Sequence, residues 1–134
     1  MSEITLLAEV TAFLRQPQGQ FIAGHRQAGH GAPFAVINPA TGEAIAEITA
    51  ADVGQADRAM ESARQAFNQW REMPTLARGA LLLKLADTLA EHREELAQLE
   101  SLCSGKTIML ARMLELDQSV AFLRYFAGRA GKNT

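Results

Sequence analysis

The second half of the chain carries apolar residues at helical spacing, and this pattern constrains the fold more than any other feature. After residue 50, one set steps by three and four positions: Val53, Ala56, Met60, Ala63, Phe67 and Trp70. This spacing places the side chains on one face of an amphipathic helix. Such a helix gains most of its stability by burying its apolar face against another element. The sequence therefore predicts helices that need an apolar partner surface.

Two more apolar stripes follow this first one. Pro74 suits the first turn of a second helix, whose stripe is Leu76, Ala80, Leu83, Ala86 and Ala90. The charged run 91–96 is expected to be a solvated turn. Glu94 and Glu95 are expected to be adjacent on a helix and to point apart, so that they form a solvated surface and no acid–base pair. Leu96, Leu99 and Leu102 then resume a buried stripe.

The last stripe is Met109, Met113, Leu116, Val120, Leu123 and Ala127. Trp70, Tyr125 and the methionines are expected in the core. Residues 51–134 are thus predicted to form three or four helices.

The first fifty residues have a different character. Apolar positions from 4 to 14 predict a helix that Pro17 and Gly19 end. Residues 21–24 are typical of a short strand running into a turn, and 28–33 of a loop. Residues 34–48 predict a β-hairpin around the turn residues 38–42.

Thr49 and Asp52 have the spacing of a helix cap before the first long helix. The fold class is therefore mixed, α/β in general and α+β in this segment, with a helix, a small β-meander and then helices.

Composition excludes several classes of protein. The 134 residues, 48% hydrophobic and 21% charged, fit one soluble globular domain. A net charge of −2 with dispersed Lys and Arg offers no nucleic-acid surface. Glu3 and Glu9 interrupt any signal-peptide pattern, and no apolar run is long enough to span a membrane. A single cysteine forms no internal disulfide, so a cytoplasmic location is expected.

The stretch Leu99–Thr107, LESLCSGKT, ends in Gly-Lys-Thr and resembles a phosphate-binding loop. That loop needs a glycine five positions before Gly105, where this chain has Glu100, a carboxylate that would repel phosphate. A helix end followed by the start of a new helix fits better, because a residue just past a helix often needs a positive φ. Lys106 then lies near the negative end of the helix dipole.

Cys103 is the one candidate nucleophile. A nucleophilic thiol needs a lowered pKa, whereas a position near a helix C-terminus raises the pKa. The histidines at 25, 30 and 92 show no spacing of a metal pair or a triad. Cys103 is therefore expected to be a small, partly buried apolar residue, and the residues by themselves give no complete active site.

The chain resembles the N-terminal portion of the NAD(P)-dependent aldehyde dehydrogenases. The similarity runs in order through VINPATGEAIAEI (36–48), DVGQADRAMESARQAFNQWREMPTLARGALLLKLADTLAEHREELAQLESLCSGK (52–106), AR (111–112) and LRYFAGRAGK (123–132). The helix that precedes FIAG (21–24) is similar to an extension in the phenylacetaldehyde dehydrogenase branch.

This resemblance implies that residues 1–134 belong to a cofactor-binding domain. Residues 1–20 would be a helical extension, 21–50 a β-meander, and 51–134 helices that pack on a Rossmann-like sheet absent from this chain. The family oxidises an aldehyde with NAD or NADP through a catalytic cysteine and a glutamate-activated water. Those groups and the nucleotide-binding loops would lie downstream, so the resemblance assigns this chain no catalytic or cofactor-binding residue. The parent enzyme would be a homodimer or homotetramer.

The resemblance also assigns two sites. The positions that line the mouth of the substrate tunnel in relatives correspond to Leu114 and Gln118, with Phe122 one turn on. A structural monovalent cation in relatives uses backbone carbonyls that match Val36 and Ile37 and a carboxylate at the position of Cys103. Since a neutral thiol is a poor ligand for a hard cation, this site is expected to be degenerate and to hold no metal.

Three hypotheses remain open for the function. The chain is an aldehyde dehydrogenase segment that is inactive alone, a truncated stand-alone helical interaction module without catalysis, or a small enzyme that uses Cys103. Without a covering sheet, the apolar faces of 53–70 and 109–127 would be exposed. The isolated chain is therefore expected to associate with itself.

Overall fold

The computed structural model describes residues 5–132 and combines helices with two small antiparallel sheets. The elements in chain order are α1 (Ala8–Leu14), β1 (Gln20–Ile22), β2 (His25–Gln27), β3 (Pro33–Ile37), β4 (Ala44–Thr49), α2 (Val53–Glu72), α3 (Thr75–Glu91), α4 (Arg93–Ser104), α5 (Ile108–Leu110), the π-helix η1 (Ala111–Asp117) and α6 (Gln118–Arg129). The predicted mixture of helices and short strands is confirmed.

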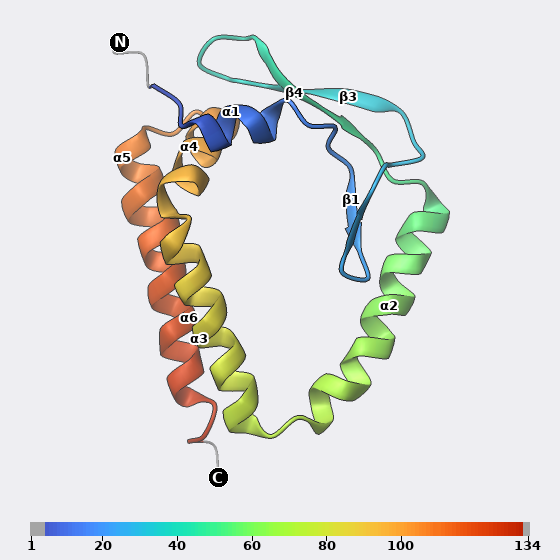
Figure 1. Ribbon diagram of the computed structural model, residues 1–134, viewed down its shortest axis with the longest axis vertical. Helices are drawn as coiled ribbons and strands as arrows, with labels where there is room; N and C mark the ends of the chain where they lie inside the picture. The colour runs from blue at the N-terminus through green and yellow to red at the C-terminus, as the bar shows by residue number, and fades with distance from the viewer. Residues whose placement is uncertain (1–4, 133–134) are drawn as a thin grey trace.

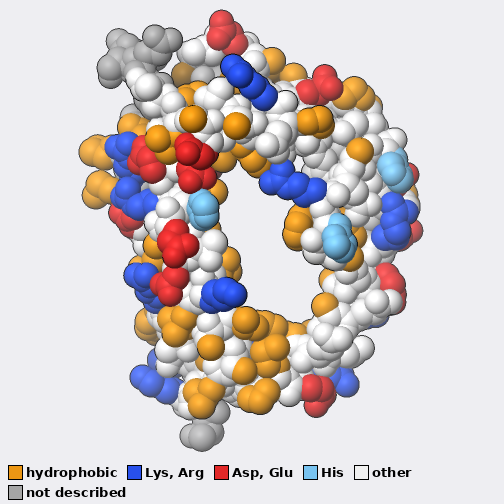
Figure 2. Space-filling model, in the orientation of Figure 1, with side chains coloured by type: hydrophobic (Ala, Val, Ile, Leu, Met, Phe, Trp, Pro, Cys, Tyr) orange, Lys and Arg blue, Asp and Glu red, His pale blue; other side chains and the backbone are white. Residues whose placement is uncertain are grey.

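These elements form an open ring. In Figure 1, α2 makes one side, and α3, α4 and α6 make the other, with α1 and the strands across one end and the α2–α3 turn across the other. The opening persists in the space-filling view of Figure 2. The accessible surface of 9577 Å² far exceeds the ~6,900 Å² expected for a compact monomer of 14.5 kDa. The chain thus leaves much more of its surface uncovered than a compact monomer of its mass does.

The buried core is correspondingly small. Its hydrophobic members are Val10, Ile22, Ala86, Ala97, Ala111, Leu116, Val120 and Ala127. Half of them are alanine, so the core is held mainly by close helix packing. The largest contact joins α3 to α6, with α4 packed against η1 and α1 against α4.

The long helices form as predicted, but much of their apolar surface is exposed. On α2, Val53 is 78% exposed and Phe67 57% exposed, because α2 meets the described chain chiefly at β1 and through its own first turn. The core placement predicted for Trp70 and Tyr125 is wrong, since Trp70 is 41% exposed and Tyr125 57% exposed. In the last stripe, Leu116, Val120 and Ala127 are buried, whereas Met109 and Met113 are exposed.

This exposed apolar surface supports the expectation that the isolated chain associates with itself. Size-exclusion chromatography with light scattering should report a mass above 14.5 kDa that rises with concentration. A single monomeric species with cooperative unfolding would contradict the prediction.

The β region contains two separate hairpins, not one meander. The hairpin predicted over 34–48 is confirmed as β3 paired with β4, with a register shift between Val36 and Ile37. β1 pairs with β2 through a two-residue turn at Ala23 and Gly24. The sequence interpretation missed β2 because its residues, His25–Gln27, have no apolar alternation.

Ala23 has a φ of 54°, a left-handed conformation that alanine adopts at a cost of about 1 kcal/mol. Both turn residues have positive φ, as a type I′ turn requires, and asparagine is favoured at the first of them. We therefore expect Ala23→Asn to raise the free energy of unfolding by about 1 kcal/mol. Urea denaturation measures this change. Ala40→Asn, in a turn where alanine has no positive φ, is the control and should change little.

Several predicted boundaries are wrong by a few residues. The first helix begins at Ala8, not at residue 4, which lies outside the described residues; the backbone at Thr5 and Leu7 bonds to Gln98 instead. The cap of α2 is Asp52, whose carboxylate accepts from the Gln55 N–H, and not the pair Thr49 and Asp52. Pro74 precedes α3, whose first residue is Thr75.

The run 91–96 is not a turn, because only His92 separates α3 from α4. The final helix is not regular either, since Ala111–Asp117 has π-helical hydrogen bonding. Within residues 5–132, no helix combines the length and the apolar character that crossing a membrane would require.

Candidate functional site

The segment from Ser101 to Thr107 is a helix end followed by a helix start, as predicted. Gly105 has a φ of 75°, and its N–H donates to the Ser101 carbonyl at the end of α4. The Thr107 side chain accepts from the Leu110 N–H and caps the next helix. Both glycine and threonine thus have structural roles, and the segment makes no phosphate loop.

Cys103 is an exposed residue, so the prediction that it is partly buried is wrong. Desolvation of the thiol, followed by the negative charge of Glu100, raises the pKa of Cys103. The sequence interpretation gave the right direction but attributed it to the helix end. A raised pKa lowers the thiolate fraction, which is the opposite of what a nucleophile needs.

An apolar pocket of about 420 Å³ adjoins this thiol. Its lining residues are Leu89, Leu96, Leu99, Glu100, Cys103, Glu115, Leu116 and Ser119. No histidine lines it: His30 pairs with Asp52, His92 pairs with Glu95, and His25 borders a different pocket. The arrangement therefore lacks the base that would activate Cys103.

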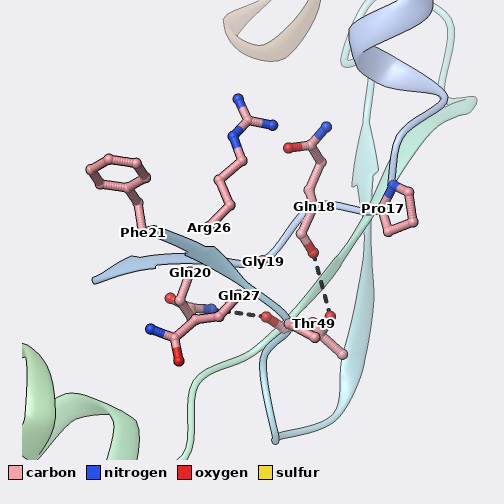
Figure 3. Close-up of a pocket in the computed structure, with 9 residues that line it drawn as sticks. Pro17, Gln18, Gly19, Gln20, Phe21, Arg26, Gln27 and Thr49 are labelled. Atoms are coloured by element: carbon pink, nitrogen blue, oxygen red, sulfur yellow. Dashed lines mark hydrogen bonds between the residues drawn. The ribbon is translucent and has the colours of Figure 1, made fainter. Parts of the chain in front are cut away.

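A second pocket, of about 520 Å³, lies where residues 17–21 meet β2 and the end of β4 (Figure 3). The Gln20 amide donates to the Thr49 carbonyl at 2.9 Å, and the Thr49 hydroxyl donates to the Gln18 carbonyl at 3.3 Å. The Arg26 guanidinium lies 5.2 Å from the centre of the Phe13 ring. None of the residues that line this pocket is a cysteine, histidine or carboxylate, so it offers no acid–base chemistry.

Two forked ion pairs tie η1 to α4. Arg93 donates from Nε and from a terminal nitrogen to the two oxygens of Asp117, at 2.5 and 2.8 Å. Arg112 donates in the same forked manner to Glu94, at 2.8 and 2.6 Å. Glu94 is therefore half-buried in an ion pair, and the prediction that Glu94 and Glu95 form only a solvated surface is wrong for Glu94.

These two forked ion pairs, Arg93–Asp117 and Arg112–Glu94, are called the forks below, and they were not found from the sequence. Their partners are 24 and 18 residues apart, and nothing in the local spacing indicates which charges meet. Each hydrogen-bonded arginine lowers the pKa of its carboxyl partner, Arg93 that of Asp117 and Arg112 that of Glu94. The hydrogen bonds that the Lys106 ammonium donates to Glu115 and Glu100 raise the pKa of Lys106 and make a third ionic contact between α4 and η1.

The forks predict a loss of stability in acid. Because the folded-state pKa values of Asp117 and Glu94 lie below their ordinary values of 3.8 and 4.5, the stabilisation is fully present above those values and is lost as the pH falls through the folded-state values. The urea midpoint should therefore decrease from about pH 5 to about pH 3. The double variant Glu94→Gln, Asp117→Asn should show a shallower decrease. Identical pH profiles would contradict this account.

The candidate tunnel residues all lie on the exposed side of the last helix. Leu114 lies within η1, Gln118 is the first residue of α6, and Phe122 follows four residues later. All three are exposed, whereas Leu116 and Val120 on the other side of the helix are buried.

The residues predicted for a degenerate cation site come from neighbouring segments. Val36 and Ile37 end β3 at the register shift, and Pro39 in the following turn lies against Gly105, two residues from Cys103. A Cβ at Gly105 would lie 2.8 Å from the Pro39 Cγ, which shows how closely the two segments approach. Within residues 5–132, no three His, Cys, Asp or Glu side chains gather as a metal ion would require.

Comparison with known proteins gives one consistent result. The model of the aldehyde dehydrogenase family matches residues 25–134. Phenylacetaldehyde dehydrogenase of Pseudomonas fluorescens is 44% identical over 101 residues, which are 74% of this chain and 20% of that protein. Aminoacetaldehyde dehydrogenase of Pseudomonas aeruginosa is 43% identical over 123 residues, 90% of this chain and 25% of that protein.

The solved NAD+ complex of aldehyde dehydrogenase from Bacillus cereus superposes with a TM-score of 0.89 at 40% identity. The superposition covers 95% of this chain and 26% of that one. The chain thus spans about a quarter of the length of these relatives. The order of its elements, the match across 25–134 and the superposition agree, and the chain belongs to the aldehyde dehydrogenase family.

Proposed function

We propose that this chain is the N-terminal segment of an aldehyde dehydrogenase that oxidises an aldehyde to a carboxylic acid with NAD or NADP. The observation that carries the proposal is the superposition of 95% of the chain on a quarter of an enzyme solved with NAD+. The catalytic cysteine and glutamate and the cofactor site would belong to the remaining three quarters. The chain alone is expected to reduce no NAD.

The division of the chain follows from the same proposal. Residues 1–20 form the extension, 21–50 the β region and 51–134 the helices of a cofactor-binding domain. Their exposed apolar side chains, such as Phe67 on α2 and Phe126 on α6, support a missing Rossmann-like sheet as the covering element. The homodimeric or homotetrameric parent and the cytoplasmic location stay predictions.

Within that enzyme, Leu114, Gln118 and Phe122 would line the mouth of the aldehyde tunnel. Their exposure on one side of the helix leaves them free to face a substrate channel built with the rest of the enzyme. The polar amide of Gln118 would suit an aldehyde that carries a hydrogen-bonding group better than a purely aromatic one. Cys103 would leave the cation site beside Val36 and Ile37 without its carboxylate ligand.

A chimera tests the proposal. Residues 1–134 of this chain replace the matching N-terminal segment of the Bacillus cereus enzyme, and NADH formation is followed with a series of aldehydes. We expect a soluble chimera that reduces NAD+. An insoluble chimera, or a soluble one without NADH formation beside an active parental enzyme, would contradict the proposal.

Two further measurements separate the alternatives. Cys103→Ser in the chimera should leave NADH formation intact; loss of activity would favour the hypothesis that Cys103 is itself catalytic. This chain alone should form no NADH with any of the aldehydes. The alternative of a stand-alone helical module finds no support among the similar proteins.

A further inference from the structure

The two forks lie at the two ends of the π-helical segment. Arg112 is the second residue of η1 and Asp117 the last, and both reach the beginning of α4, at Glu94 and Arg93. Each helix supplies one cation and one anion to the forks. The cation and anion of α4 are Arg93 and Glu94, and those of η1 are Arg112 and Asp117. Forked arginine–carboxylate pairs fix orientation as well as distance.

The five-residue spacing between Arg112 and Asp117 suits the π geometry. In a regular α-helix, five residues rotate the side chain by about 140° from its starting direction, so the two side chains would point in more divergent directions. In a π-helix the hydrogen bonds run from i to i+5, and the wider turn brings the directions of residues five apart closer together. The forks and the π geometry therefore support each other.

Further contacts hold the same segment. Lys106 bonds to Glu100 on α4 at 3.0 Å and also to Glu115 in η1. Glu94 accepts from the amide of Gln98, whose oxygen accepts from the Leu7 N–H at 2.9 Å. Gln98 is buried, so this network extends from the N-terminal segment through α4 to η1.

The π geometry determines how Leu114 is oriented relative to Gln118. Leu114 lies inside η1 and Gln118 directly after it. In an α-helix, residues four apart lie on one face, whereas the wider turn of a π-helix changes the angle between them. Collapse of η1 to α-helix would therefore redirect one of these side chains.

We infer that the forks Arg93–Asp117 and Arg112–Glu94 hold η1 in π-helical geometry and thereby make these four residues positioning residues for aldehyde selection. The inference rests on the proposed function, because it takes Leu114 and Gln118 as tunnel residues. None of the four touches the aldehyde. Their effect is on which aldehyde fits, through the direction of Leu114 and Gln118.

The test uses the chimera with two aldehydes of different length, acetaldehyde and hexanal, and compares the ratio of their kcat/KM values. Asp117→Asn removes the charge of one fork and should change this ratio about fivefold. Asp117→Glu keeps the fork and should retain the ratio. The matched control is Asp87→Asn, which breaks the single bond of an exposed pair with Arg124 between α3 and α6, and it should leave the ratio unchanged.

Two additional measurements keep the inference falsifiable. Arg112→Lys, which replaces the other fork by a point charge, should shift the ratio in the same direction as Asp117→Asn. Hydrogen exchange of the amides of residues 111–117 should accelerate in both variants and not in Asp87→Asn. Unchanged exchange, or a ratio that moves no more than in the control, would overturn the inference.

Leu114→Ala and Gln118→Ala separate this inference from the proposed function. If they shift the ratio while the fork variants do not, the tunnel assignment stands and the inference falls. If none of the variants shifts the ratio in an active chimera, the tunnel assignment falls with the inference. In that case the dehydrogenase proposal stands on the activity of the chimera.

Discussion

Replacing Gln55 with leucine is expected to destabilise the junction between residues 28–31 and α2 by about 3 kcal/mol. The Gln55 side chain is fully buried, and its oxygen accepts from the backbone N–H groups of His30, at 2.8 Å, and Asp52, at 3.3 Å. Its amide donates to the Ala28 carbonyl at 2.8 Å. Leucine would fill a similar space but leave these backbone groups without their partner, and each lost partner is costly when buried.

Hydrogen exchange measures this effect locally. A loss of about 3 kcal/mol corresponds to exchange about a hundredfold faster at the His30 amide. The matched control is Gln65→Leu on the same helix, where the glutamine is exposed and bonds only to Glu61 among the described residues. Equal exchange at the His30 amide in the two variants would show that the Gln55 side chain does not stabilise residues 28–31.

The role of Gln55 was partly predictable. A glutamine three residues after a capping residue is the signature of a capping box, and Asp52 and Gln55 have this spacing. The sequence interpretation placed the cap at Thr49 because it expected the helix to begin earlier. The bonds to Ala28 and His30 could not be predicted, since they depend on where a loop about 25 residues away folds back.

Periodicity predicted the helices well and their burial poorly. The three–four pattern of α2 identifies which face of the helix is apolar, but a pattern contains no information on what covers that face. Val53 and Phe67 are exposed in this chain although they follow the stripe. Only the resemblance to longer enzymes led to the expectation that a sheet outside this segment covers that face.

At the candidate site, too, the sequence predicted local structure but not the contacts between segments. The helix end at Gly105 depends on local chemistry and was predicted from it. The forks at Asp117 and Arg112 lie in the π-helical segment η1, and regular apolar spacing across 109–127 concealed that irregularity. Charged residues that pair across two helices are therefore found only once the register of both helices is known.

Replacing Gly79 with leucine is expected to lower the free energy of unfolding by about 3 kcal/mol, because the side chain would force α3 and α6 apart. A Cβ at Gly79 would lie 3.0 Å from the Ala127 carbonyl oxygen and 3.1 Å from the Ala130 Cβ. The contact of α3 with α6 is the most extensive one in the described chain, and its buried residues Ala86 and Ala127 are small. Such close packing leaves no room for a leucine side chain, although leucine favours helix more than glycine does.

The same substitution at Gly128 separates packing from helix propensity. Gly128 also lies within a helix, α6, but a Cβ there would meet nothing within 4 Å. Gly128→Leu should therefore raise the free energy of unfolding by about 0.8 kcal/mol through helix propensity alone. Urea denaturation followed by helical circular dichroism measures both variants. Because the two changes are chemically identical, opposite signs would attribute the loss at Gly79 to the α3–α6 contact, and equal signs would show that the two helices do not pack this closely in solution.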